Sequence, residues 1–142
     1  MSDYYQANST QSTTIKPNIA NPEASRELAM TIADAAADRK AGDIVILGVA
    51  EVSYVADYFV LVTGYSKVQV RAIAGAIADT VEQQWQQRPL RVEGQAEGNW
   101  VLQDYGDVLV HIMMPKEREF YNLEAFWGHA ERIIPPSAGN EE

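Results

Sequence analysis

Residues 100–113 read WVLQDYGDVLVHIM and contain two strand-like runs on either side of Tyr105 and Gly106. Gly106 supplies the positive φ angle that a tight two-residue turn requires. We therefore predict a β-hairpin in which Asp104 faces Asp107 across the turn. This hairpin decides the fold, because it places the second half of the chain in a sheet.

Side chains alternate between the two faces of a strand, so the predicted hairpin has two chemically different faces. β-Branched residues dominate one face, which we expect to be the core side under helices: Val101, Gln103, Val108, Val110 and Ile112. The other face, called the mixed face from here on, combines large apolar groups with acids and an imidazole: Trp100, Leu102, Asp104, Asp107, Leu109 and His111. Such a mixture is typical of a surface that meets a partner.

Asp104, Asp107 and His111 raise the alternative of a metal or catalytic site. Along a regular strand, Asp107 and His111 would lie about 13 Å apart. Ligands of one ion must lie within about 2–2.5 Å of it, so these side chains cannot share an ion while both strands stay regular. We therefore predict no metal, no cofactor and no catalytic residue here, and a packed or hydrogen-bonded His111 rather than a general base.

Apolar periodicity along the rest of the chain predicts an α/β fold with a mixed β-sheet of about five strands flanked by helices. A strand, a helix and a further strand in succession indicate a parallel unit. The last predicted helix carries Phe120, Leu123, Trp127 and Ala130 on one stripe. The predicted elements are a helix at 21–40, antiparallel strands at 43–49 and 58–64, a helix from Ser66 to about Arg88, a strand at 90–94, the hairpin and a helix at 116–134.

Length and composition limit the possible domain organisation and the class of binding partner. The 142 residues suit one domain at 21–134, between a disordered tail at 1–20 and a C-terminal tail at 135–142. The net charge of −9 disfavours direct nucleic-acid binding and favours a basic protein partner. The absence of cysteine, of a membrane-spanning apolar run and of a secretory signal leads us to expect a cytoplasmic protein without membrane contact.

Gly64-Tyr65-Ser66 lies between a predicted strand and a predicted helix, where backbone N–H groups could hold an anion. Neither a GxxxxGK[ST] nor a GxGxxG loop is present, so a turn followed by an N-cap is the simpler interpretation. Two-metal nucleotidyl transfer would need a pair of carboxylates one residue apart after this turn. The following helix offers only Asp79.

Three stretches together resemble one family: SYVADYFVLVTGYSKVQVRAIAGAI (53–77), VEGQAEGNWVLQDYGDVLVHIM (92–113) and REFYNLEAFW (118–127). In this order they are similar to the Iojap, or ribosome silencing factor, family, and the likeness covers roughly residues 25–132. The resemblance implies a nucleotidyltransferase-like fold without catalytic activity. It also implies binding to the large ribosomal subunit through its fourteenth ribosomal protein, a block of subunit joining that lowers translation when nutrients are short, and possible homodimers.

Carried over by position, the contact surface of that family falls on Trp100, Leu102, Asp104, Tyr105 and Asp107. This set overlaps the mixed face, so we predict partner binding by these five residues together with Leu109 and His111. Gln103 departs from the apolar residue common at its position, but it points to the core face and should not weaken docking. We therefore predict a non-enzymatic binding protein, and a nucleotidyltransferase-type or nucleotide-binding enzyme is the alternative.

Overall fold

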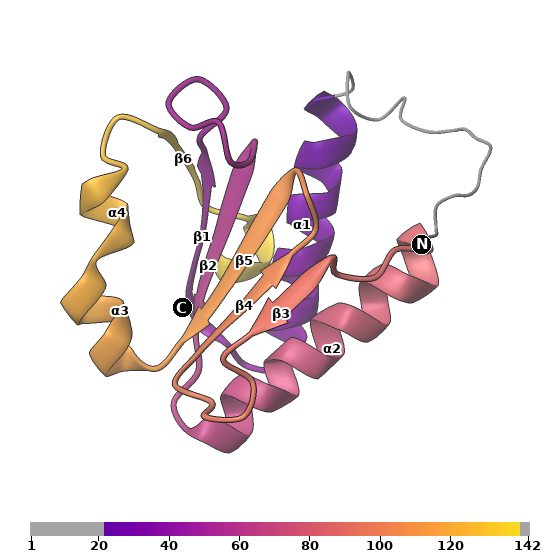
Figure 1. The fold of residues 1–142 in the computed structure, drawn as a ribbon, viewed down its shortest axis with the longest axis vertical. Coiled ribbons are helices and arrows are strands. Elements are labelled where there is room, and N and C mark those ends of the chain that lie inside the picture. Colours follow the sequence, from indigo (N-terminus) through magenta and orange to yellow (C-terminus); the bar gives the residue numbers. More distant parts are fainter. Residues whose placement is uncertain (1–21, 140–142) are drawn as a thin grey trace.

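The structure is a computed structural model that describes residues 22–139. The tail predicted at 1–20 and Asn21, the first residue of the predicted helix at 21–40, lie outside the described residues. The elements, in chain order, are α1 (Pro22–Asp38), β1 (Gly42–Gly48), β2 (Tyr58–Thr63), α2 (Lys67–Trp85), β3 (Arg91–Glu93), β4 (Trp100–Asp104), β5 (Val108–Met113), α3 (Pro115–Tyr121), α4 (Leu123–Phe126), β6 (Glu131–Ile133) and α5 (Pro136–Gly139) (Figure 1).

The strands form one mixed sheet in the order β3-β4-β5-β2-β1-β6. Among the described strands, β2 and β5 pair in parallel and every other neighbouring pair is antiparallel. The predicted α/β class with a mixed sheet is confirmed, with six described strands instead of about five. The strands β2 and β3 do run in the same direction, but β4 and β5 lie between them.

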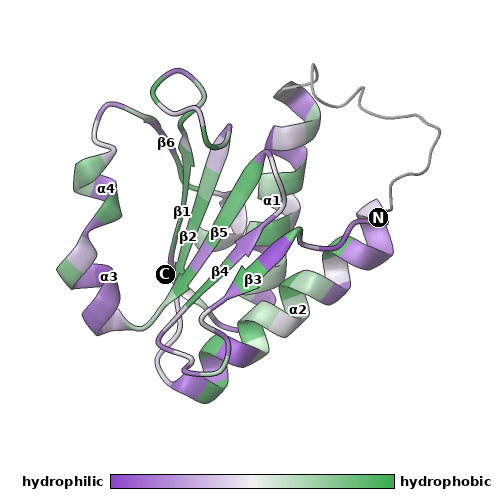
Figure 2. Cartoon of the chain, viewed as in Figure 1, coloured by the Kyte–Doolittle hydropathy of each residue, from purple (hydrophilic) through white to green (hydrophobic). Residues whose placement is uncertain are grey.

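Helices α1 and α2 cover one face of the sheet (Figure 1). Ser66 caps α2 as predicted, because its hydroxyl accepts a hydrogen bond from the backbone N–H of Gln69 at 3.0 Å. The helix ends at Gln86, whose left-handed backbone stops the helical hydrogen bonding. One side of α2 is apolar and buried, and Figure 2 shows the matching hydrophobic colour along β1 and β5: Val70, Ile73, Ala74, Ile77 and Val81.

The predicted hairpin exists, but its predicted register is wrong by two residues. The backbone N–H of Tyr105 donates to the carbonyl of Val108, so Gly106 and Asp107 form the tip of the turn. Asp104 consequently pairs with Leu109 and not with Asp107. A shift of two preserves the alternation of side chains. The predicted core face therefore packs under α1 and α2: Val101, Gln103, Val108, Val110 and Ile112.

The predicted helix at 116–134 is wrong in its second half. Asn122 adopts a left-handed conformation with φ of 45° and ends α3, which asparagine tolerates better than most residues. A turn that contains His129 follows α4, and the chain then forms β6, which pairs with β1. Within the predicted tail, the described residues form the one-turn helix α5, and Ala138 packs against the main core.

The second face of the sheet is partly covered by residues 115–130, called the C-terminal arm from here on (Figure 1). Apolar residues of β1, β2, β5 and the connection between β1 and β2 form a second buried cluster on this face: Val45, Leu47, Val49, Ala56, Phe59, Leu61 and Leu109. Leu123, Trp127 and Ala130 of the arm pack against it, as does Leu102 of β4. The arm thus covers the central strands on this second face of the sheet, which includes the mixed face of the hairpin. It leaves β4 near its boundary.

Gln103 provides a test of the core. Its amide nitrogen donates to the carbonyl of Ala74 in α2 at 2.9 Å, while its amide oxygen has no partner among the described residues. Gln103→Met removes both groups at similar volume, so we expect the free energy of unfolding in urea to change by less than about 1 kcal/mol. Ile112→Ala, on the same face, should cost about 2–5 kcal/mol. A loss above about 2 kcal/mol for Gln103→Met would contradict this assignment.

Candidate docking surface

The Trp100 indole is half-buried at the start of β4. Its Nε1–H donates to Nδ1 of His111 at 3.2 Å. The indole also lies against the ring of Tyr121 in the C-terminal arm, with ring centroids 4.7 Å apart. The indole is therefore fixed from two sides, by the sheet and by the arm, while part of it remains exposed.

His111 is buried on β5 and confirms the prediction of a packed, hydrogen-bonded histidine. Phe59 of β2 contacts the imidazole edge to face, with centroids 5.3 Å apart. Burial, and then the positive charge of Arg118, lower the pKa of His111 to about 4. The neutral ring accepts at Nδ1, so its proton resides on Nε2, which has no partner in the part of the chain that the structure describes.

Leu102 and Asp104 continue the mixed face along β4, and both are half-exposed. Leu102 packs on the second apolar cluster. One carboxylate oxygen of Asp104 accepts from the backbone N–H of Gly106 at 2.8 Å, and the other lies 3.6 Å from the Arg91 guanidinium. We call Trp100, Leu102 and Asp104 the docking strip, because these three side chains combine the predicted chemistry with access to solvent.

The other predicted binding residues are placed differently. Tyr105 is buried in the main core, and this burial raises its pKa to about 12. Asp107 does not share a face with Asp104, because its carboxylate accepts a hydrogen bond from Ser25 of α1. Burial, and then the charge of Asp57, raise the pKa of Asp107. Leu109 and His111 do lie on the mixed face, but they are buried and support the docking strip from below.

The site offers little to a metal ion or a nucleotide. Among residues 22–139, no group of three or more histidine, aspartate or glutamate side chains is arranged to hold a metal ion. At the Gly64–Ser66 turn, the Gln69 side chain already accepts from the N–H of Tyr65, and Ser66 from the N–H of Gln69. These N–H groups are therefore engaged by the turn and the cap.

Across the same described range, no helix is both long and apolar enough to span a membrane.

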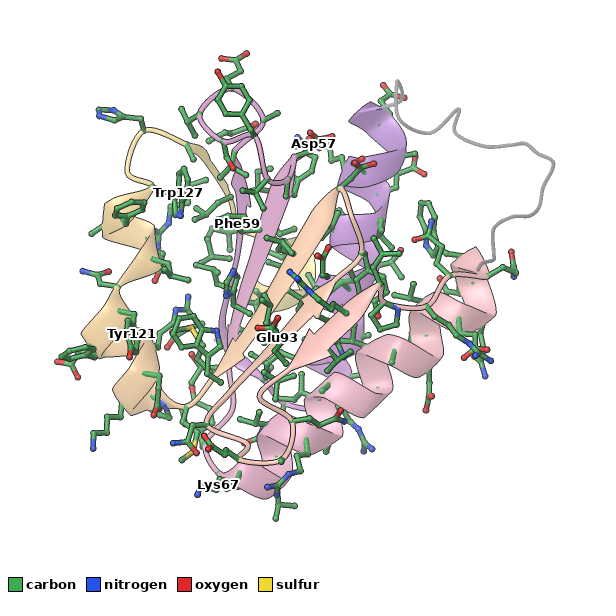
Figure 3. The ribbon with its side chains drawn as sticks, in the orientation of Figure 1. Asp57, Phe59, Lys67, Glu93, Tyr121 and Trp127 are labelled. Atoms are coloured by element: carbon green, nitrogen blue, oxygen red, sulfur yellow. The ribbon has the colours of Figure 1, made fainter. Side chains whose placement is uncertain are left out.

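Aromatic residues of the C-terminal arm were not predicted as part of the surface. Phe120 was expected on a packed stripe, but 77% of it is exposed. Tyr121, labelled on the arm in Figure 3, is half-exposed. Its ring contacts that of Trp100. The density of aromatic side chains in REFYNLEAFW is the sequence feature that could have indicated this part of the surface. The break at Asn122, which separates α3 from α4, could not be placed from periodicity alone.

Comparisons with known proteins give a consistent result. Residues 22–142 match the family described as ribosomal silencing factor during starvation. Ribosomal silencing factor RsfS of Bacillus subtilis is 45% identical over 93 residues, which cover 66% of this chain and 78% of the relative. Protein Iojap, chloroplastic, of Zea mays is 39% identical over 109 residues, covering 76% of this chain and 46% of the relative. This chain therefore spans less than half the length of the maize protein.

A mouse protein named mitochondrial assembly of ribosomal large subunit protein 1 is 29% identical over 89 residues, covering 61% of this chain and 39% of the relative. A crystal structure of a Chromobacterium violaceum protein matches with a TM-score of 0.70 and 33% identity, covering 72% of this chain and 85% of that one. The fold therefore agrees with a solved structure of related sequence.

The lowered pKa of His111 predicts a pH dependence of stability. Between pH 6.5 and about 4, the unfolded chain binds a proton at His111 that the folded chain does not. The free energy of unfolding should therefore fall on acidification through this range. From pH 7 to pH 5 we expect the wild type to lose about 2 kcal/mol more than His111→Leu. Urea titrations at both pH values measure this, and equal losses in the two proteins would contradict a neutral, buried His111.

Proposed function

This chain belongs to the ribosomal silencing factor family, and from that premise we propose that it binds the large ribosomal subunit and lowers translation by blocking the joining of the small subunit. The name of the Bacillus relative refers to ribosomal silencing, and that of the mouse relative to assembly of the large subunit. The specific partner that we propose is the fourteenth protein of the large subunit. A net charge of −9 is suited to a basic protein on the ribosome.

The observation that carries the proposal is the docking strip. Trp100 and Leu102 present apolar surface next to the carboxylate of Asp104, with buried apolar residues directly beneath them. Binding energy at protein interfaces concentrates in such aromatic anchors, particularly where neighbouring groups exclude water. We propose that Trp100 and Leu102 become buried against the partner, and that Asp104 meets one of its basic side chains.

The fixed orientation of the indole favours binding. A side chain that is already ordered loses little conformational freedom when a partner covers it. Trp100 is held by its hydrogen bond to His111 and by its contact with Tyr121. Leu109 and His111 therefore contribute to binding by holding the docking strip in position. We assign direct contact with the partner to Trp100, Leu102 and Asp104.

We also propose that the chain acts as a binding protein and not as an enzyme, in the compartment that holds its ribosomes. Relatives named as silencing factors support this view, as does the engagement of the N–H groups at the Gly64–Ser66 turn. Titration calorimetry with ATP and magnesium tests the enzymatic alternative, because saturable micromolar binding would support it. A homodimer remains part of the proposal, because a mixed apolar face can pair with itself across a two-fold axis.

Trp100→Ala should weaken binding to purified large subunits by about 2 kcal/mol, or roughly 30-fold, because it removes the central anchor. Sedimentation of the chain with large subunits through a sucrose gradient measures this. In parallel, wild type added to separated subunits should reduce their joining, and the variant should not.

Val68→Ala provides the control, since Val68 is an exposed apolar residue of α2, the helix that covers the opposite face of the sheet. This variant should sediment like wild type. The face is wrongly assigned if Trp100→Ala remains folded, as judged by its thermal unfolding, and still travels with large subunits as wild type does.

A further inference from the structure

A pocket of about 380 Å³ lies directly beside the docking strip, between the start of β4, the preceding turn and α3. Three aromatic side chains, Trp100, Phe120 and Tyr121, line it together with the side chains of Glu97, Lys116 and Glu117. Tyr121 contacts both other rings, with centroids 4.7 Å from Trp100 and 4.9 Å from Phe120. Two of these rings are well exposed, so the pocket opens to solvent on its aromatic side.

The wall opposite the arm is the turn at residues 94–99, and it is built by specific contacts. Gly94 has a φ of 82°, and a Cβ there would collide with the carbonyl oxygen of Trp100, so only glycine lets the turn close on the strand. Arg71 of α2 donates to the carbonyls of Gln95 and Ala96 at 3.0 and 2.7 Å. Asn99 donates to Glu117 at 3.2 Å and joins the turn to α3. The pocket is therefore largely formed before any partner arrives.

The charged side chains that line the pocket favour a cation, while Arg71 is engaged by the carbonyls of the turn. Glu97 and Glu117 contribute two carboxylates against the single ammonium group of Lys116. Within residues 22–139, neither Glu97 nor Lys116 takes part in an ion pair, so both charges are available. Aromatic faces attract lysine and arginine head groups through their quadrupoles, and nearby carboxylates strengthen that preference.

We propose that this pocket receives a lysine or arginine side chain of the ribosomal protein that the docking strip contacts. The inference rests on the proposed function and extends it, because it adds a charge-selective subsite to an apolar anchor. The basic side chain would lie along Trp100 and Phe120, with its head group between Glu97 and Glu117. Trp100 then serves both sites, with one part against the apolar surface of the partner and another toward the basic side chain.

Two other occupants of the pocket predict different effects of these substitutions on affinity. A phosphate of ribosomal RNA would be attracted by Lys116 and repelled by both carboxylates. An apolar side chain would respond to the aromatic walls and be indifferent to the charges. Substitutions at these charged positions therefore separate the three chemistries by the sign of their effect on affinity.

The test measures the dissociation constant of the full chain for purified large subunits, at low and at high salt. Glu97→Gln and Glu117→Gln should each weaken binding about two- to fivefold, and less at high salt. The glutamine at position 117 keeps an oxygen for Asn99. Phe120→Leu keeps apolar bulk without a π face and should also weaken binding about two- to fivefold. Lys116→Gln should tighten binding about twofold.

Matched controls lie on the same arm outside the pocket. Glu119→Gln removes an exposed carboxylate of α3, and Phe126→Leu removes a phenyl ring that is 75% exposed, close to the 77% of Phe120. Both should bind like wild type. The pocket proposal fails, and the proposed function stands, if the pocket variants match these controls while Trp100→Ala loses binding. Weaker binding by Lys116→Gln would assign the pocket to an anion, and failure of the wild type to bind would remove both proposals.

Discussion

The hydrogen bond from the Trp100 indole to His111 ties the exposed edge of this protein to its interior. Its acceptor exists only while the imidazole is neutral, and burial between Phe59 and the neighbouring strands keeps it so. His111 in turn is fixed because β5 is buried along its whole length, with α1 and α2 on one face and the second apolar cluster on the other. The half-buried Trp100 indole is thereby oriented by a buried side chain.

The C-terminal arm determines how much of the mixed face remains available. Arg118 attaches the arm to the sheet, since it donates to the hydroxyl of Thr63 at 2.8 Å and to both carboxylate oxygens of Glu124 at 3.0 and 3.1 Å. The hydrogen bond from Arg118 accordingly lowers the pKa of Glu124. Trp127 then packs edge to face on Phe59. Because the arm covers β1, β2 and part of β5, the accessible remainder of the mixed face is the strip along β4 and the aromatic pocket beside it.

Sequence periodicity predicted the helix-covered side of the fold well and the other side less well. The helix α2 and the core face of the hairpin are indicated by apolar patterns, and both are confirmed. The register of the hairpin was predicted wrongly because Gly106 fits a turn at Tyr105–Gly106 as well as one at Gly106–Asp107. The paired residues were nevertheless assigned to the correct faces, because a register shift of two residues keeps the alternation of side chains between the faces. Two residues of the turn were misplaced, because Tyr105 is buried in the main core and Asp107 bonds to Ser25 of α1.

The arm was hardest to predict because its structure depends on tertiary contacts. Residues 116–134 have a helical apolar pattern, yet Asn122 ends α3, and the three-residue strand β6 pairs with β1 and packs Ile133 against the main core. So short a strand carries no periodic signal of its own. For the same reason, the pocket formed by Phe120, Tyr121 and Trp100 could not be inferred, as its walls come from segments that meet only in the folded chain.

Site-specific photo-crosslinking tests the central claim most directly, namely that the strip along β4 faces a ribosomal protein. A photoreactive amino acid at position 102, between Trp100 and Asp104, would be activated in the presence of purified large subunits, and the crosslinked product would be identified by mass spectrometry. The account predicts one dominant product with a basic protein of the large subunit, the fourteenth, and none from the same group at position 68 on α2. Crosslinks from position 68 but not from position 102, or products with ribosomal RNA alone, would contradict it.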